Sequence, residues 1–458
     1  MLRKTLVVDG ITPVGAYAAL RRDAGEGAFL LESVVPGERW GRYSIIGYRP
    51  SSHVAVWGRA GVDPFEELRQ RIPGGDSRET DVALRFASAH VGLLAYDIVH
   101  YATKVEAWPA GAEDRPVARF IGDATVIVFD NLTHTATIAA RDADELERAE
   151  QHLGRVVSLP PIAPPDPQAL PDDVEVNMSD AEYGVRVERA KEYIRAGDAF
   201  QIVPARTFST QAHDTDPFDV YRALRVLSPA PYMYLLELPE RPSAPAVAIA
   251  GASPETLVRV ENQRITLRPI AGTRRRGRSD EEDQRLAQEM LDDPKERAEH
   301  VMLIDLARND VGRVAHPGTV QLRQNMGVER FSHVMHIVSE ITGELAAGQS
   351  AWDVLRATFP AGTLTGAPKV RAMQIIRELE VRPRGAYGGA LGYVTRSTDL
   401  DFAILIRTVV MQGGRFEVTA GAGIVADSIP ELEAKETRNK ARAALAAIHA
   451  ARTRSAGV

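Results

Sequence analysis

The 458-residue sequence contains no cysteine. A chain without cysteine forms no disulfide, no thiolate zinc site and no iron–sulfur cluster, and it has no cysteine nucleophile. Any metal ion that it binds must be held by oxygen or imidazole ligands. The absence therefore excludes thiol chemistry and restricts the metals to those that accept hard ligands.

An excess of basic residues and long apolar runs are also missing. The 55 lysine and arginine residues and 62 aspartate and glutamate residues give a net charge of −7, which argues against a nucleic-acid partner held by a basic face. No run approaches the ~18 apolar residues of a membrane span. Asp9 and Gly10 interrupt the apolar stretch behind the basic N-terminus, so no signal peptide is expected. These features predict a soluble cytoplasmic protein with no membrane partner.

A proline-rich stretch divides the chain. Prolines at 160, 161, 164, 165 and 167 can continue neither a helix nor a central strand. We therefore predict an N-terminal region over residues 1–155, a connector over 156–178 and a larger C-terminal region over 179–458.

Strands and helices follow one another without strict alternation. Strands are predicted near residues 29–34, 43–47, 53–57, 124–129, 201–203, 246–250, 265–270, 390–395 and 403–411. Helices are predicted near residues 180–196, 281–291, 295–308, 369–379 and 431–451. No G-x-G-x-x-G motif opens a helix after a strand. The pattern favours an α+β fold with large antiparallel sheets over a doubly wound parallel fold.

Two glutamates begin one of the predicted helices. Asp293 and Pro294 mark the helix start, and Glu296 and Glu299 follow on a shared face. Glu296 has a purely local alternative as a capping-box residue. Glu299 shares its stripe with the apolar Leu303, so we expect it to be partly buried and to have a cationic partner.

A second pair, Glu433 and Glu436, lies near the C-terminus and precedes Lys440. A solvent-exposed helix with a Glu436–Lys440 pair is the structural alternative, and such a pair contributes only ~0.3–0.5 kcal/mol. Two such helices also suit Mg²⁺, which takes few protein carboxylates and leaves positions open for an anionic substrate.

Several turns and isolated polar residues are further candidates. Glycine-bearing turns span residues 269–277, 361–369 and 420–423, and the second precedes a helix whose N-terminal amides suit an anion. Arg407 lies in an otherwise apolar predicted strand, where its charge requires an anionic partner. His336, beside apolar neighbours and close to His333, is either a core residue or a proton carrier.

Taken together, these strings resemble the chorismate-utilising enzymes. The resemblance is carried, in order and approximate spacing, by residues 198–203, 269–277, 298–310, 332–336, 362–369, 421–423 and 437–442, and a string over 30–44 extends it almost chain-wide. Within that family the chain is most similar to the large subunit of anthranilate synthases. The resemblance implies a sandwich of mostly antiparallel sheets flanked by helices. It also implies a Mg²⁺-dependent conversion of chorismate and ammonia to anthranilate and pyruvate, the first step of tryptophan biosynthesis.

The resemblance also assigns roles to residues of this sequence. It implies that the metal ligands are Glu299 and Glu436, with Glu296 and Glu433 beside them. It implies that substrate is held by Thr273, Tyr387, Arg407, Gly421, Gly423 and Lys440. It implies that catalysis uses Glu255 as the general acid, His336 in the aromatising elimination and Thr363 in the anion pocket.

Two positions separate this chain from relatives. Gln201 stands where water-adding isochorismate and salicylate synthases carry a lysine, and Ala271 stands where many aminodeoxychorismate synthases carry a nucleophilic lysine. Direct attack by ammonia is therefore favoured. Aminodeoxychorismate synthase remains the nearest alternative, and a non-catalytic amino-acid sensor is a second one, although a sensor has no need of the paired glutamates.

The resemblance extends to regulation and to a partner. Two strings resemble the family's tryptophan feedback site, and they comprise Leu31, Glu32 and Ser33 together with Pro231, Tyr232 and Met233. Their structural alternative is an edge strand and a proline-rich turn. Ser228 replaces the usual asparagine, which leaves the strength of inhibition open. Because the chain has no cysteine, it cannot contain a glutaminase of the cysteine-nucleophile type. If glutamine is the nitrogen source, a separate glutamine amidotransferase subunit must supply the ammonia.

Overall fold

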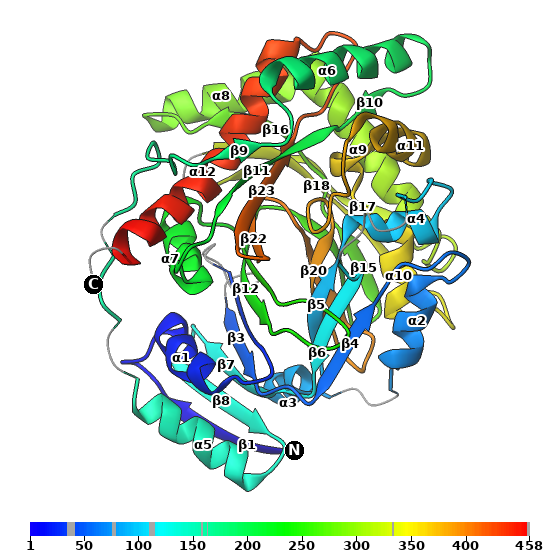
Figure 1. Ribbon diagram of the computed structural model, residues 1–458. Coiled ribbons are helices and arrows are strands. Elements are labelled where there is room, and N and C mark those ends of the chain that lie inside the picture. The colour runs from blue at the N-terminus through cyan, green and yellow to red at the C-terminus, as the bar shows by residue number, and fades with distance from the viewer. Residues whose placement is uncertain are drawn as a thin grey trace.

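The computed structural model describes residues 1–33, 42–75, 79–109, 115–156, 159–162, 164–331 and 334–455. Two large sheets, in which all described pairings are antiparallel, form its centre, and helices surround them (Figure 1). His333 and residues 34–41 of the N-terminal string lie outside the described residues.

The first sheet, sheet A, runs from the N-terminal strand to a short strand of the connector. Its order is β1 (Leu2–Val7), β8 (Thr135–Ala140), β7 (Thr125–Asp130), β3 (Tyr43–Tyr48), β2 (Ala28–Glu32), β12 (Tyr232–Leu238), β13 (Val247–Ser253), β22 (Thr408–Gln412), β23 (Arg415–Gly421), β11 (Ala205–Gln211) and β9 (Glu175–Val176).

The second sheet, sheet B, has the order β16 (Ile270–Arg275), β18 (Val334–Glu344), β15 (Arg264–Leu267), β14 (Thr256–Glu261), β21 (Leu400–Ile404), β20 (Ala390–Val394), β5 (His90–Leu94), β6 (Ala118–Gly122) and β4 (Ser52–Val56). A further strand, β17 (Gln321–Arg330), pairs with β18. A separate two-stranded ladder joins β10 (Gln201–Ile202) to β19 (Gly366–Ala367).

Segments from both sides of the proline-rich connector share these sheets. In sheet A, β2 pairs with β12, and in sheet B, β5 pairs with β20. The backbone ladders of the predicted N-terminal and C-terminal regions are thus continuous with each other.

The helices cover the outer faces and one end of the sandwich. They are α1 (Pro13–Leu20), α2 (Pro64–Arg71), α3 (Val82–Ala87), α4 (Val99–Ala102), α5 (Ala143–Gly154), α6 (Asp180–Arg195), α7 (Pro217–Leu227), α8 (Asp280–Asp292), α9 (Pro294–Gly312), α10 (Ala351–Thr358), α11 (Lys369–Leu379) and α12 (Pro430–Ser455). Short 3₁₀ turns are η1 (Arg21–Asp23), η2 (Tyr96–Ile98) and η3 (Gly362–Leu364).

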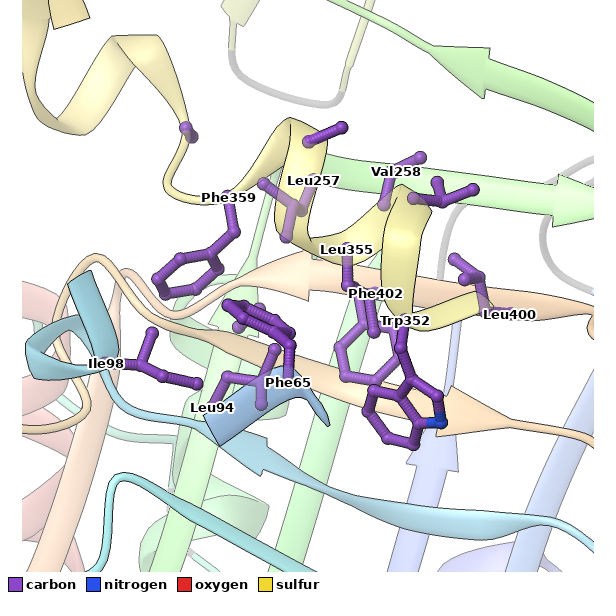
Figure 2. Close-up of a cluster of buried hydrophobic side chains, with 14 of the residues drawn as sticks. Phe65, Leu94, Ile98, Leu257, Val258, Trp352, Leu355, Phe359, Leu400 and Phe402 are labelled. Atoms are coloured by element: carbon purple, nitrogen blue, oxygen red, sulfur yellow. The ribbon is translucent and has the colours of Figure 1, made fainter. Parts of the chain in front are cut away.

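Three apolar clusters hold the layers together. One lies between the two sheets and includes Phe29 and Leu236 of sheet A and Leu391 of sheet B. A second packs α1, α5, α7 and α12 against the outer face of sheet A. The third lies on the outer face of sheet B, where Trp352 and Leu355 of α10 pack onto the sheet (Figure 2). Fully burying a side chain of this kind contributes about 1.5–3 kcal/mol.

The predicted α+β fold with large antiparallel sheets is confirmed, as are the predicted helices. Two strand predictions are wrong. The predicted strand at 265–270 is the end of β15 and the first residue of β16, which pair with different parts of β18, and the residues between them, Arg268 and Pro269, belong to neither strand. The apolar run at 403–411 is two strands, because the chain leaves β21 in sheet B after Ile404 and enters β22 in sheet A at Thr408. Apolar character continues through the break because both strands are buried between layers. None of the helices in the described residues is long and apolar enough to cross a membrane.

Candidate active site

Two neighbouring crossovers between the sheets create the site. The chain passes from β13 to β14 through Pro254 and Glu255, and from β21 to β22 through residues 405–407. The crossovers run side by side, since the Ile404 amide donates to the Glu255 carbonyl at 3.0 Å and the Ala252 amide donates to the Arg407 carbonyl at 3.2 Å. Arg407 has a φ of +53°, which fits the sharp change of direction between sheets.

A cavity of about 410 Å³ opens at these crossovers. It is lined by all the predicted catalytic, substrate-binding and metal-binding residues except Glu296. They come from α9, α12, β16, β18, β23, η3, the two crossovers, the segment before β20 and the turn after β23. Side chains that are widely separated in the sequence therefore converge on one space of a size typical for a small ligand.

Carboxylates from two helices line one part of the cavity. Asp293 caps α9 by accepting hydrogen bonds from the amides of residues 295 and 296, and Glu299 then lines the cavity one turn along. Glu433 and Glu436 line it from the first turns of α12. Burial, together with the charge of Glu436, raises the pKa of Glu433 above its usual range. The ion pair between Glu436 and Lys440, which was the structural alternative to a metal site, is present at 2.6 Å.

The partner of Glu299 differs from the expected cation. Its Oε1 accepts a hydrogen bond from Gln201 Nε2 at 3.2 Å, and among the described residues it forms no ion pair. Glu299 thus keeps its negative charge uncompensated by a basic side chain. Among the described residues no three acidic or histidine side chains form a preformed metal cluster. The donors nevertheless fit Mg²⁺, because they are hard oxygens and Mg²⁺ commonly keeps positions for water and substrate.

Glu296 takes a different position from Glu299. Its carboxylate pairs with Arg274 Nη1 at 2.9 Å, and Asp293 pairs with the same guanidinium at 3.2 Å. Glu296 does not line the cavity. Nor does it form the capping box weighed from the sequence, since Asp293 alone caps the helix with its side chain.

Glu255 is a carboxyl group suited to proton donation. Burial raises its pKa to about 7, although a hydrogen bond from Thr363 and the charge of Lys440 act in the opposite direction. Thr363 Oγ1 donates to Glu255 Oε1 at 2.9 Å from the η3 turn. A carboxyl group with such a pKa is protonated in a substantial fraction at neutral pH, so it can act as a general acid.

His336 lies on β18 beside a bulge in β16. The register shifts between Ala271 and Arg274, and Gly272 has a φ of +65°. There the Gly272 carbonyl accepts a hydrogen bond from His336 Nδ1 at 2.8 Å. Nδ1 must carry the proton to donate in this way, so Nε2 has a free lone pair. Burial lowers the pKa of His336, which favours the neutral ring that a base requires.

The remaining polar residues can hold an anion. Arg407 donates Nη1 to the Lys440 carbonyl at 3.0 Å, and among the described residues it has no carboxylate partner. Lys440 Nζ donates to the Gly421 carbonyl at 3.0 Å. A Cβ at Gly421 would lie 2.8 Å from the Tyr387 hydroxyl, and one at Gly423 would lie 2.8 Å from Gln201 Nε2. At Gly421 the Cβ would also lie 2.7 Å from the Pro204 carbonyl oxygen, so this position requires glycine.

Sequence reasoning missed Lys295 and Ser428, which also line the cavity. Lys295 stands four residues before Glu299, so the spacing of the helix could have identified it. The glycine-bearing turn over residues 361–369 faces the cavity through Thr363 and Leu364. The first residues of α11, whose amides were expected to suit an anion, do not line the cavity.

The two segments that resemble a tryptophan feedback site, residues 31–33 and 231–233, lie at neighbouring strands, β2 and β12. Met233 of β12 is paired with Glu32 of β2. The buried Glu32 accepts a hydrogen bond from Tyr221 at 2.6 Å and pairs with Arg225 at 3.0 Å. None of these residues lines the active-site cavity.

Comparisons with known proteins place the chain in a family. A model described as chorismate binding enzyme matches residues 28–446. The anthranilate synthase component 1 of Aquifex aeolicus is 42% identical over 478 residues, covering 97% of this chain and 94% of that protein. That of Thermus thermophilus is 42% identical over 461 residues, covering 98% of each.

A solved structure agrees with these relatives. The crystal structure of anthranilate synthase component I from Streptococcus pneumoniae has a TM-score of 0.76 and 34% sequence identity, and the match covers 90% of this chain and 94% of that chain. The family model and the relatives each span most of the sequence, including both crossovers and both glutamate helices. The chain belongs to the chorismate-binding enzymes and, among them, to the anthranilate synthase component 1 proteins.

Proposed function

We propose that this chain converts chorismate and ammonia to anthranilate, pyruvate and water. The observation that carries the proposal is the single cavity in which the carboxylates of α9 and α12 lie together with Arg407, Glu255 and His336. A dianionic substrate needs both of its carboxylates neutralised, and a hydroxide leaving group needs a proton.

Substrate binding divides between two parts of the cavity. Arg407, Tyr387 and the amides of Gly421 and Gly423 would hold the enolpyruvyl carboxylate. Thr273 and Lys440 would complete this anion pocket. Glu299 and Glu436 would hold Mg²⁺, with Glu433 close by and Glu296 supporting the helix through Arg274. When bound there, Mg²⁺ supplies positive charge for the ring carboxylate.

The two chemical steps use different groups. In the first, ammonia forms a bond to C2, the C4–oxygen bond breaks, and Glu255 gives its proton to the departing hydroxyl, which leaves as water. In the second, the Nε2 lone pair of His336 removes the C2 proton, the bond between C3 and the ether oxygen breaks, and the ring becomes aromatic. The enolpyruvyl group leaves as an enolate, which takes up a proton to become pyruvate. The hydrogen bond from Thr363 holds Glu255 in place for the first step.

Ammonia would come from a second polypeptide. The chain has no cysteine, and the relatives carry the designation component 1. We infer that a separate glutamine amidotransferase subunit cleaves glutamine and delivers ammonia to this chain in the cytoplasm. Glutamine alone should then yield no anthranilate with this chain, whereas an ammonium salt should.

Tryptophan would act as a feedback inhibitor at the paired strands β2 and β12. Leu31, Glu32 and Ser33 lie next to the string formed by Pro231, Tyr232 and Met233. The Glu32 carboxylate, held by Arg225, could receive the ammonium group of an amino acid. Tryptophan should therefore lower the rate, and replacement of Glu32 by alanine should relieve the inhibition.

One assay tests the proposed reaction. Purified protein with chorismate, Mg²⁺ and an ammonium salt at alkaline pH should develop anthranilate fluorescence. Accumulation of aminodeoxychorismate without anthranilate would instead support the alternative synthase. Binding of tryptophan without any turnover would support the sensor and contradict the proposal.

A further inference from the structure

A buried arginine outside the cavity organises one of its walls. Arg384 lies in the segment that follows α11, and only 7% of the residue is exposed. Its guanidinium pairs with Glu380, with Nη2 to Oε1 at 2.6 Å and Nε to Oε2 at 2.9 Å. Arg384 does not line the cavity, so it cannot contact a bound substrate there.

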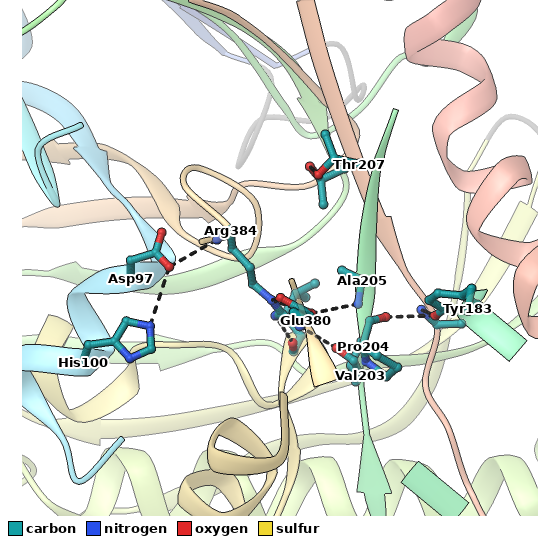
Figure 3. A network of polar contacts seen from close by, with 12 residues as sticks. Asp97, His100, Tyr183, Val203, Pro204, Ala205, Thr207, Glu380 and Arg384 are labelled. Atoms are coloured by element: carbon teal, nitrogen blue, oxygen red, sulfur yellow. Dashed lines mark hydrogen bonds and ion pairs between the residues drawn. The ribbon is translucent and has the colours of Figure 1, made fainter. Parts of the chain in front are cut away.

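The same guanidinium holds two backbone segments that do line the cavity. Nη2 donates to the Val203 carbonyl at 2.6 Å (Figure 3). Nη1 donates to the Leu364 carbonyl at 2.8 Å. Val203 follows Gln201 of β10, and Leu364 follows Thr363 of η3. One planar group thus joins the segment after β10 to the η3 turn, although the two are far apart in the chain.

Arg384 also supports a substrate-binding side chain. Its guanidinium carbon lies 5.5 Å from the ring centre of Tyr387 and 4.4 Å from that of Tyr96. These separations are within the range of cation–π contact. Burial raises the pKa of Tyr387 to about 12, so its hydroxyl remains a hydrogen-bond donor at every working pH.

The arginine is itself fixed from the N-terminal part of the chain. Asp97 of η2 accepts the Arg384 amide at 3.2 Å and the Gly385 amide at 2.6 Å. Glu380 accepts the Ala205 amide at 2.9 Å, which ties β11 to the same network. The guanidinium donates to one carboxylate, that of Glu380, and to two backbone carbonyls, those of Val203 and Leu364. Only a planar side chain with several donors can make all of these hydrogen bonds at once.

We propose that Arg384 is a positioning residue for substrate binding, which sets Val203, Leu364 and Tyr387 as one rigid wall of the cavity. This inference rests on the proposed use of the cavity for chorismate. A lysine at this position can keep the ion pair with Glu380, but it cannot reach both carbonyls and stack on both tyrosines. The wall should then loosen while the buried charges remain balanced.

The test compares R384K with a matched control, R119K. Arg119 is equally buried, with 7% exposed, and it donates to the carbonyls of Pro239 and Pro245, yet it does not line the cavity. Chorismate binding is measured by calorimetric titration in the presence of Mg²⁺, and KM and kcat are measured with ammonium. R384K should raise Kd and KM about tenfold or more and change kcat less, because the wall holds substrate and transition state alike. R119K should lower the melting temperature but leave Kd and KM unchanged.

Three results would overturn the proposal. They are a folded R384K whose Kd and KM equal those of the wild type, a loss in R384K confined to kcat, and an R119K that weakens chorismate binding as much as R384K does. If R384K does not fold, D97N provides the milder variant, because an amide keeps one acceptor for the Arg384 and Gly385 amides, and a smaller rise in Kd is expected. A wild-type protein that binds chorismate but forms no anthranilate contradicts the proposed reaction alone, since Kd still reports on Arg384.

Discussion

Glu255 links the stability of the fold to the chemistry of the site. Burial raises its pKa from 4.5 to about 7, a difference that corresponds to about 3 kcal/mol. Since the folded protein binds this proton more tightly than the unfolded chain does, the stabilisation is complete below the unfolded pKa. It is lost as the pH rises through the folded pKa near 7. The buried carboxylate that remains at high pH opposes folding.

Replacement of Glu255 by glutamine should separate stability from activity. The amide stays neutral at every pH, so E255Q does not bury a charged carboxylate at high pH and is not destabilised by it. Its free energy of unfolding relative to wild type should rise by about 3 kcal/mol between about pH 4.5 and about pH 8.5. Because an amide cannot give up a proton to the departing hydroxyl, kcat should fall about 10²–10⁴-fold. E431Q, on the exposed first turn of α12, controls for the general effect of removing a carboxylate.

Two measurements test this reasoning. Denaturant unfolding across the pH series gives the difference between the variants, and anthranilate fluorescence at constant free ammonia gives kcat/KM for the wild type. The wild-type kcat/KM should decline above a pH of about 7, as the free enzyme loses its acid. Parallel stability curves for wild type and E255Q, or a wild-type kcat/KM that is flat through this range, would refute the assignment.

Other predictions address the metal, the base and the glycines. E299Q and E436Q should each raise the Mg²⁺ concentration needed for activity and lower turnover about 10²-fold, and a Mg²⁺ titration that matches wild type would contradict their role. H336A should slow pyruvate release about 10²–10⁴-fold and accumulate the aminated, non-aromatic intermediate, which mass spectrometry detects; rapid release of pyruvate would speak against a base at this position. G421A places a Cβ 2.7 Å from the Pro204 carbonyl, so it should raise KM for chorismate about tenfold, whereas G154A, with nothing within 4 Å, should not.

Local patterns in the sequence were sufficient for the helices and for the individual glutamates. The start of α9 is encoded by Asp293 and Pro294, because Asp293 caps the helix with its side chain and Pro294 suits the first helical position. The spacing of Glu433, Glu436 and Lys440 is equally local, and the structural alternative that it offered, an ion pair between the last two, is present. Such features depend only on neighbours within one or two turns.

The break at Arg407 could not be read from the same kind of pattern. Residues 403–411 are apolar on both sides of the break, because β21 and β22 are each covered by a layer of the sandwich. What ends β21 is the change of pairing partner, from β14 in sheet B to β13 in sheet A. Pairing partners lie far away in the sequence, so the apolar pattern within one segment does not predict which strands it will pair with.

Arg384 was missed for a related reason. Arg384 stands four residues after Glu380, and this spacing alone indicates only an ordinary ion pair near a helix end. Its importance comes from Val203, Leu364 and Asp97, which belong to three other parts of the chain.

The two crossovers explain why the site lies where it does. Where β13 and β21 leave their sheets, their backbones turn away from the ladders, and the side chains of Glu255 and Arg407 emerge at the end of the sandwich rather than between its layers. A carboxyl group and a guanidinium group can then face one cavity without interrupting the apolar core. The hydrogen bonds that join the crossovers to each other fix their spacing. Because each crossover carries one of these two side chains, a shift of one sheet against the other would move Glu255 and Arg407 together. Within sheet A, β2 and β12 are continuous with both crossovers through β13 and β22.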